Sequence, residues 1–247
     1  SNRLSLDDNY TEGTDRERGF ARRHREPIFS FFSGSYQRAR SAGQCLVLSD
    51  FDALSMMSAL RQHYREDENL FRKGSIRSVC MHKTALGDHT TSSMILVANK
   101  KQKTIWLTGC STPCLALYKP VYFTDPWPPV YTDSQESLAY WLKREYLVRA
   151  IYAGLIDVAS YRGKIRLLQE QFVREEKELL AREGSNKEMA LFSEKCSRLE
   201  EELIDSYQEE IEKVRENPEI LPKMWRKYTS SLGKNVFARD LQDRIGK

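Results

Sequence analysis

The chain has 247 residues, of which 40% are hydrophobic and 30% are charged, and this composition excludes a wholly disordered protein. The formal net charge is only +4, with acids and bases interspersed, which argues against a nucleic-acid partner. No apolar run approaches the roughly 20 residues that a membrane helix needs, so we expect no membrane partner either.

The chain begins with a polar lead-in. Residues 1–26 are charged and show no sustained period, which predicts an extended or partly disordered segment. Residues 27–42 predict a short buried strand or turn, marked by four apolar side chains, and then a short helix. The four side chains are Ile28, Phe29, Phe31 and Phe32. Capping residues at 49–52 precede a helix whose apolar positions recur at helical spacing from Leu54 to Leu60.

Three strands are predicted in the middle of the chain, over residues 75–82, 90–97 and 103–109. Their β-branched and aromatic side chains favour strand structure, and short connections join them. Strands joined in this way form an antiparallel meander. A further extended segment is predicted over residues 115–123, after a loop that contains Pro113.

The period becomes helical from Asp133 onward, with Asp133 or Ser134 as the expected N-cap. Apolar residues recur at three- and four-residue steps on both sides of a break at 184–186. This pattern is typical of a helical hairpin with a narrow packing seam. Asn217 and Pro218 end the second arm, and a short helix around Trp225 and a polar tail follow.

Grouped strands followed by grouped helices predict an α+β fold, with antiparallel strands before a long α-helical hairpin. We divide the chain into three parts. They are a polar lead-in (1–26), an α+β region with the antiparallel strands (27–132), and the helical hairpin with a C-terminal tail (133–247).

The five cysteines are odd in number and irregularly spaced, which favours reduced thiols in a cytoplasmic protein. Cys80 and His82 are two residues apart, so on a strand both would point to one face. They could form a Cys/His nucleophile pair, but their separation along a strand, roughly 6–7 Å, favours a buried structural cysteine. Zinc held by Cys80, His82, Cys110 and Cys114 is the other alternative. Because this spacing matches no common zinc-finger pattern, we expect no metal and no cofactor.

Several motifs resemble the C-terminal half of the dipeptidase/secernin family. They are a Cys-Met-His strand at 80–82, a Thr-Thr-x-Ser-Met strand at 90–94, a Trp strand ending in a small-residue Pro-Cys turn at 105–114, and a Pro-Val-Tyr segment at 120–122. The helix start at 140–145 is also similar. The resemblance implies an N-terminal-nucleophile hydrolase, with an αββα sandwich, of which this chain would be the C-terminal part.

In such enzymes, an N-terminal cysteine attacks an amide carbonyl, and its own α-amino group serves as the base. Arg38 and Arg40 follow a Gly/Ser turn, where they could form a solvated helix face or hold a carboxylate bidentately. By the resemblance they are supporting catalytic candidates, and His82 and Thr91 are candidate substrate-binding residues.

The chain begins with Ser1 rather than with a cysteine. We therefore expect the C-terminal portion of a cysteine-dependent amide or peptide hydrolase, dipeptidase-like, inactive alone and with its nucleophile upstream. The implied substrate is a small peptide or acyl-amino compound. The alternative is a non-catalytic, secernin-like protein that acts in assembly. Half a sandwich would expose a core face, so the expected partner is the upstream half or a second copy.

Overall fold

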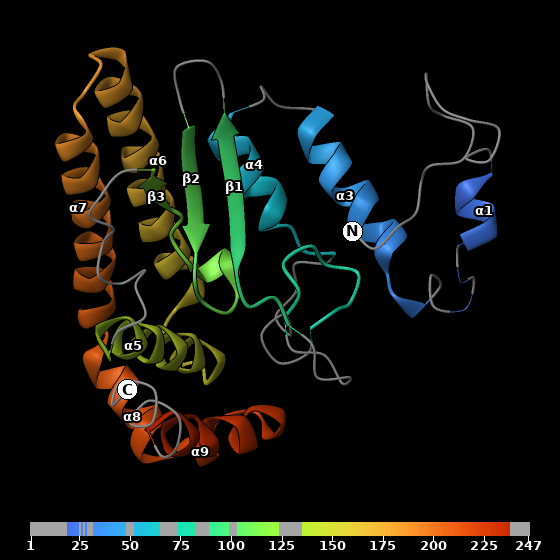
Figure 1. Cartoon of the computed structure of the whole chain (residues 1–247). Coiled ribbons are helices and arrows are strands. Elements are labelled where there is room, and N and C mark those ends of the chain that lie inside the picture. Colours follow the sequence, from blue (N-terminus) through green and yellow to red (C-terminus); the bar gives the residue numbers. More distant parts are fainter. Residues whose placement is uncertain are drawn as a thin grey trace, which may run out of the picture. The chain divides into compact units, whose positions relative to one another are not determined.

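The computed structural model describes residues 19–24, 26, 28, 32–47, 52–64, 74–82, 89–98, 103–123 and 135–237. The chain divides into a first unit, Ser1–His89, and a second unit, Thr90–Lys247. Helices and one three-stranded antiparallel sheet make it an α+β protein, as predicted (Figure 1).

The first unit contains α1 (Phe20–His24), α3 (Ser35–Val47) and α4 (Ala53–Leu60). The helix predicted after residues 49–52 is confirmed as α4. The Asp52 side chain accepts a hydrogen bond from the backbone N–H of Ser55 at 2.8 Å, and the Ser55 hydroxyl accepts one from the Asp52 N–H at 3.1 Å. This capping box satisfies two amide donors at the helix start.

Two predictions for the first unit are wrong. Residues 75–82 form turns and irregular backbone instead of a strand, because the Ser78 N–H bonds locally to the Ser75 carbonyl. The alternating pattern there reflects the burial of individual side chains and not a strand ladder. Of the apolar side chains at 27–32, Ile28 and Phe32 are described, and both are exposed instead of buried.

The sheet of the second unit has the order β1-β2-β3, with β1 (Ser93–Ala98), β2 (Lys103–Thr108) and β3 (Lys119–Tyr122). Both pairings are antiparallel. The second and third predicted strands are confirmed, and the extended segment predicted at 115–123 supplies the remaining strand. A short 3₁₀ helix, η1 (Pro113–Leu115), lies between β2 and β3.

The two faces of this sheet differ. Ile95 pairs with Trp106, and both are buried. On the opposite face, Met94 and Leu96 are 65% and 58% exposed. Pairing places them opposite half-buried residues of β2, Leu107 and Ile105. One side of the sheet thus carries an apolar stripe that is partly open to solvent.

In the described residues 135–237 five α-helices follow, namely α5 (Gln135–Tyr152), α6 (Val158–Ala181), α7 (Asn186–Asp205), α8 (Gln208–Glu216) and α9 (Lys223–Phe237). The break at 184–186 is confirmed, and α6 and α7 lie side by side (Figure 1). The helix end before Asn217 and the helix around Trp225 are also confirmed. The predicted cap at Asp133 or Ser134 lies outside the described residues.

Buried polar side chains of these helices hold the loop between β2 and β3. The Glu145 carboxylate accepts a hydrogen bond from the Ser111 N–H at 2.9 Å, and Arg144 donates to the Leu115 carbonyl at 2.8 Å. Gln169 bonds both the N–H and the carbonyl of Tyr118. The helices therefore hold the backbone of this loop in addition to burying apolar surface. None of the described helices combines the length and apolar character that a membrane crossing requires.

Candidate metal centre

Three buried side chains with metal-binding atoms converge in the first unit. His63 lies three residues after the end of α4, and Cys80 and His82 lie in the irregular segment 78–82. Cys80 is fully buried, and His63 and His82 are 8% and 2% exposed. Buried polar side chains of this kind need a partner, because their desolvation is costly.

The geometry of the three side chains is compact. The Nε2 atoms of His63 and His82 lie 3.1 Å apart, and their rings meet nearly edge-on at 79°. All the ligand atoms of the group, including the Cys80 sulfur, lie within 4.8 Å of one another. Two nitrogens bound at 2.0–2.1 Å to a tetrahedral zinc ion lie roughly 3.3 Å apart. The imidazole spacing therefore suits one shared ion.

The types of ligand also suit a transition metal. Two imidazole nitrogens and a thiolate are a donor set that Zn²⁺ accepts, whereas Ca²⁺ and Mg²⁺ require oxygen ligands. Their burial would exclude water from the ion. Neutral imidazoles and a deprotonated thiol are the forms that bind metal.

Two hydrogen bonds tie the ligand-bearing segments together. The Cys80 N–H donates to the carbonyl of Gln62 at 3.0 Å, and the Tyr64 N–H donates to the Ser78 hydroxyl at 3.0 Å. Gln62 and Tyr64 are the two chain neighbours of His63. The backbone on both sides of this ligand is thus attached to the segment that carries the other two.

The structure places the predicted site residues in different settings. Arg38 lies in α3 and donates to the backbone carbonyls of Ser33, at 2.6 Å, and of Ile76. Burial lowers the pKa of Arg38. Arg40 is exposed on the same helix, and Thr91 is exposed in the irregular segment before β1. Of the four residues predicted as supporting catalytic or substrate-binding candidates, His82 is the one that belongs to the convergent group.

The ligand that sequence reasoning missed is His63. The zinc alternative grouped Cys80 and His82 with two cysteines of the second unit, Cys110 and Cys114. His63 lies 17 positions before Cys80, in a spacing that matches no familiar motif. The available signal was a histidine directly after an amphipathic helix, and that signal is weak.

Cys110 is buried in the loop after β2, where it contacts Arg144, whose guanidinium donates to the sulfur at 3.5 Å. Burial raises the pKa of the Cys110 thiol, and the charge of Arg144 offsets this only in part. The thiol is therefore protonated at neutral pH and poorly suited to nucleophilic attack.

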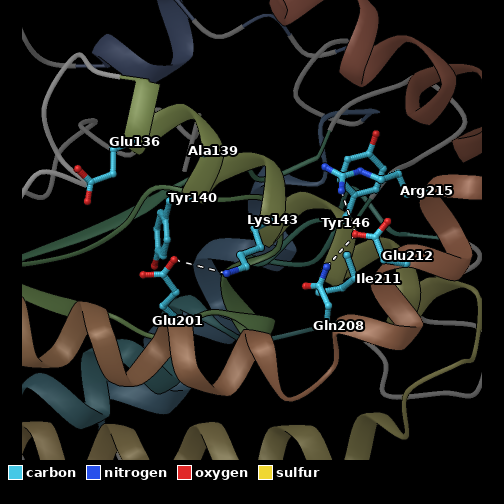
Figure 2. Close-up of a pocket in the computed structure, with 10 residues that line it drawn as sticks. All are labelled: Glu136, Ala139, Tyr140, Lys143, Tyr146, Glu201, Gln208, Ile211, Glu212 and Arg215. Carbon is cyan, nitrogen blue, oxygen red and sulfur yellow. Dashed lines mark hydrogen bonds and ion pairs between the residues drawn. The ribbon is translucent and has the colours of Figure 1, made fainter.

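The second unit also has a polar groove of about 250 Å³ lined by residues of α5, α7 and α8 (Figure 2). Lys143 forms an ion pair with Glu201 at 3.5 Å, and Arg215 forms one with Glu212 at 2.9 Å. Arg215 also stacks over the Tyr146 ring. Because these charges are paired with one another, they are less available to a ligand. The buried group of the first unit is therefore the stronger candidate site.

Comparison of the chain with protein-family models, with curated proteins and with solved structures finds no match.

Proposed function

We propose that the first unit binds one Zn²⁺ ion with His63, Cys80 and His82 among its ligands, and that this ion has a structural role. The observation that carries the proposal is the convergence of three buried ligand atoms from two irregular segments. Such segments lack the ladder hydrogen bonds of helices and strands, so a metal ion is an effective cross-link between them.

A structural role is favoured over a catalytic one because of burial. Catalytic zinc sites keep one position open to water or substrate, whereas structural sites are closed. Cys80 is fully buried and His82 nearly so. The same burial argues against Cys80 as a nucleophile, because a substrate carbonyl must reach the sulfur.

Metal content tests the proposal directly. Purified protein is expected to contain one zinc ion per chain by elemental analysis, and Co²⁺ substitution is expected to give the absorption of a tetrahedral site with thiolate ligation. Cys80→Ser and His63→Asn should abolish stoichiometric binding. Cys45→Ser, in α3, and His24→Asn, in α1, are matched controls and should bind normally. Wild-type protein that binds neither ion would refute the proposal.

A second proposed function follows from the resemblance to the dipeptidase/secernin family. We propose that the chain belongs to an amide hydrolase of the N-terminal-nucleophile type, in which its second unit forms a wall of the αββα sandwich. The observation that favours this is the open apolar stripe on the sheet. A second sheet, from the upstream half or from a second copy, would cover Met94 and Leu96.

Enzyme activity and assembly test this second proposal separately. The chain alone is expected to show no dipeptidase turnover, and thiol-dependent turnover would contradict that expectation. If the stripe joins two copies, Met94→Ser combined with Leu96→Ser should shift the molar mass measured by light scattering from dimer to monomer. Thr91→Ala, at an exposed site before β1, is the control.

A further inference from the structure

We propose that Ser78 is the positioning residue of the metal centre, acting on His63 through the backbone; this inference rests on the proposed zinc site. The Ser78 hydroxyl accepts a hydrogen bond from the N–H of Tyr64, the residue that follows His63. Ser78 itself contributes no ligand atom to the group.

The need for a positioning residue comes from the irregular backbone at the site. Residues 62–64 and 78–82 contain no helix or strand, so no ladder fixes the distance between them. Two bonds flank His63 in their place, one to the Gln62 carbonyl and one from the Tyr64 N–H. The first joins two backbone groups. The second depends on the Ser78 side chain and can therefore be removed by mutation.

Ser78 is well suited to this role because it is rigidly placed. It is only 2% exposed, so its hydroxyl is shielded from water. Its own N–H bonds to the Ser75 carbonyl at 3.1 Å, which closes a turn. Without the hydroxyl, the Tyr64 N–H would lose its acceptor, and the backbone after His63 would be held less firmly.

The turn that contains Ser78 is itself attached to α3 and to the residue before it. Arg38 donates to the carbonyl of Ile76, two residues before Ser78. Gly34 has a φ of +64°, and a Cβ there would lie 2.7 Å from the Ile76 oxygen. This close approach requires glycine. A continuous set of contacts therefore runs from the start of α3 through Ile76 and Ser78 to the backbone beside His63.

The expected loss of metal affinity in Ser78→Ala can be set from other metal sites. Removing a hydrogen bond that orients a metal ligand typically lowers metal affinity by about 10–100-fold. Ser78→Ala should weaken Co²⁺ binding by this factor without changing which atoms bind the ion. The positions of the Co²⁺ absorption bands should therefore remain those of the wild type, because they report the ligand set.

The experiment is a competitive Co²⁺ titration of wild type, Ser78→Ala, Ser78→Thr and Ser75→Ala. Ser78→Thr keeps a hydroxyl and should recover most of the lost affinity. Ser75→Ala is the matched control, since it removes a similar bond from the Arg77 N–H in the same turn, and it should bind like the wild type.

The outcomes distinguish this inference from the proposed function. If the wild type binds no Co²⁺, the metal site itself is refuted. If the wild type binds but Ser78→Ala binds equally well, the positioning role alone is refuted. Equal losses in Ser78→Ala and Ser75→Ala, or no recovery in Ser78→Thr, would indicate general damage to the turn and would also contradict the inference.

Discussion

The Nε2 atoms of His63 and His82 face each other at 3.1 Å inside the first unit. In the absence of metal, this distance requires one ring to donate a hydrogen bond from Nε2–H to the bare Nε2 of the other, because two bare nitrogen lone pairs repel. A bound ion needs both lone pairs, so both rings must then carry their proton on Nδ1. The two states of the pair therefore differ in tautomer.

The tautomer change is measurable by NMR on protein labelled with ¹⁵N-histidine. Adding Zn²⁺ should convert the ring that donates from Nε2 to the Nδ1–H form and leave the accepting ring in that form, with no change at the exposed His24. The expected signature is two Nε2 resonances with metal-bound shifts. A spectrum in which only one of the two Nε2 resonances takes a metal-bound shift would mean that the pair does not share an ion.

Removing the metal should open the first unit and leave the second intact. Among the described residues of the first unit, the buried apolar side chains are Met57, Ala59 and Cys80. The described part of the unit therefore gains little stability from apolar burial. Structural zinc binding in small domains contributes roughly 10–16 kcal/mol, so the ion would dominate the stability of this unit.

Limited proteolysis with and without a chelator, read by mass spectrometry, checks this expectation. Chelation should speed cleavage within residues 32–82 by at least tenfold and leave residues 135–237 resistant. Added Zn²⁺ should reverse the effect. Equal cleavage of the first unit in both conditions would show that its fold is independent of metal.

Much of the second unit could be predicted from sequence because its signals are local. β-Branched and aromatic side chains mark β1 and β2, and Gly184 marks the break between α6 and α7. The buried polar contacts could not be predicted. Gln169 bonds to Tyr118 across 51 positions, and helical spacing alone does not show that a polar side chain will reach a distant loop.

The candidate site of the first unit was harder to predict because it too depends on contacts between residues far apart in the sequence. Its candidate site depends on His63 meeting Cys80 and His82 across irregular backbone. Strand alternation correctly suggested that Cys80 and His82 share surroundings, but the strand itself was wrong. No periodic pattern encodes a contact between a helix end and a turn.

The last prediction concerns acid stability of the second unit. Glu200 is buried, where desolvation acts to raise the pKa of its carboxyl. The charges of Lys119 and Arg144 outweigh this effect and lower the pKa to about 2. A carboxyl with a lowered folded pKa stabilises the fold above its unfolded pKa, near 4.5, and this stabilisation is lost as pH falls from there toward about 2.

Glu200→Gln tests this directly. Removing the carboxylate leaves Lys119 and Arg144 buried without their partner, which should cost roughly 3–5 kcal/mol at pH 7. Between pH 5 and pH 3, the stability of the variant should also fall much less than that of the wild type, because the carboxyl of Glu200 is gone. Urea unfolding followed by tryptophan fluorescence reports on this unit, since every tryptophan lies after residue 90. Glu202→Gln, exposed on the same helix, is the control and should unfold like the wild type at both pH values.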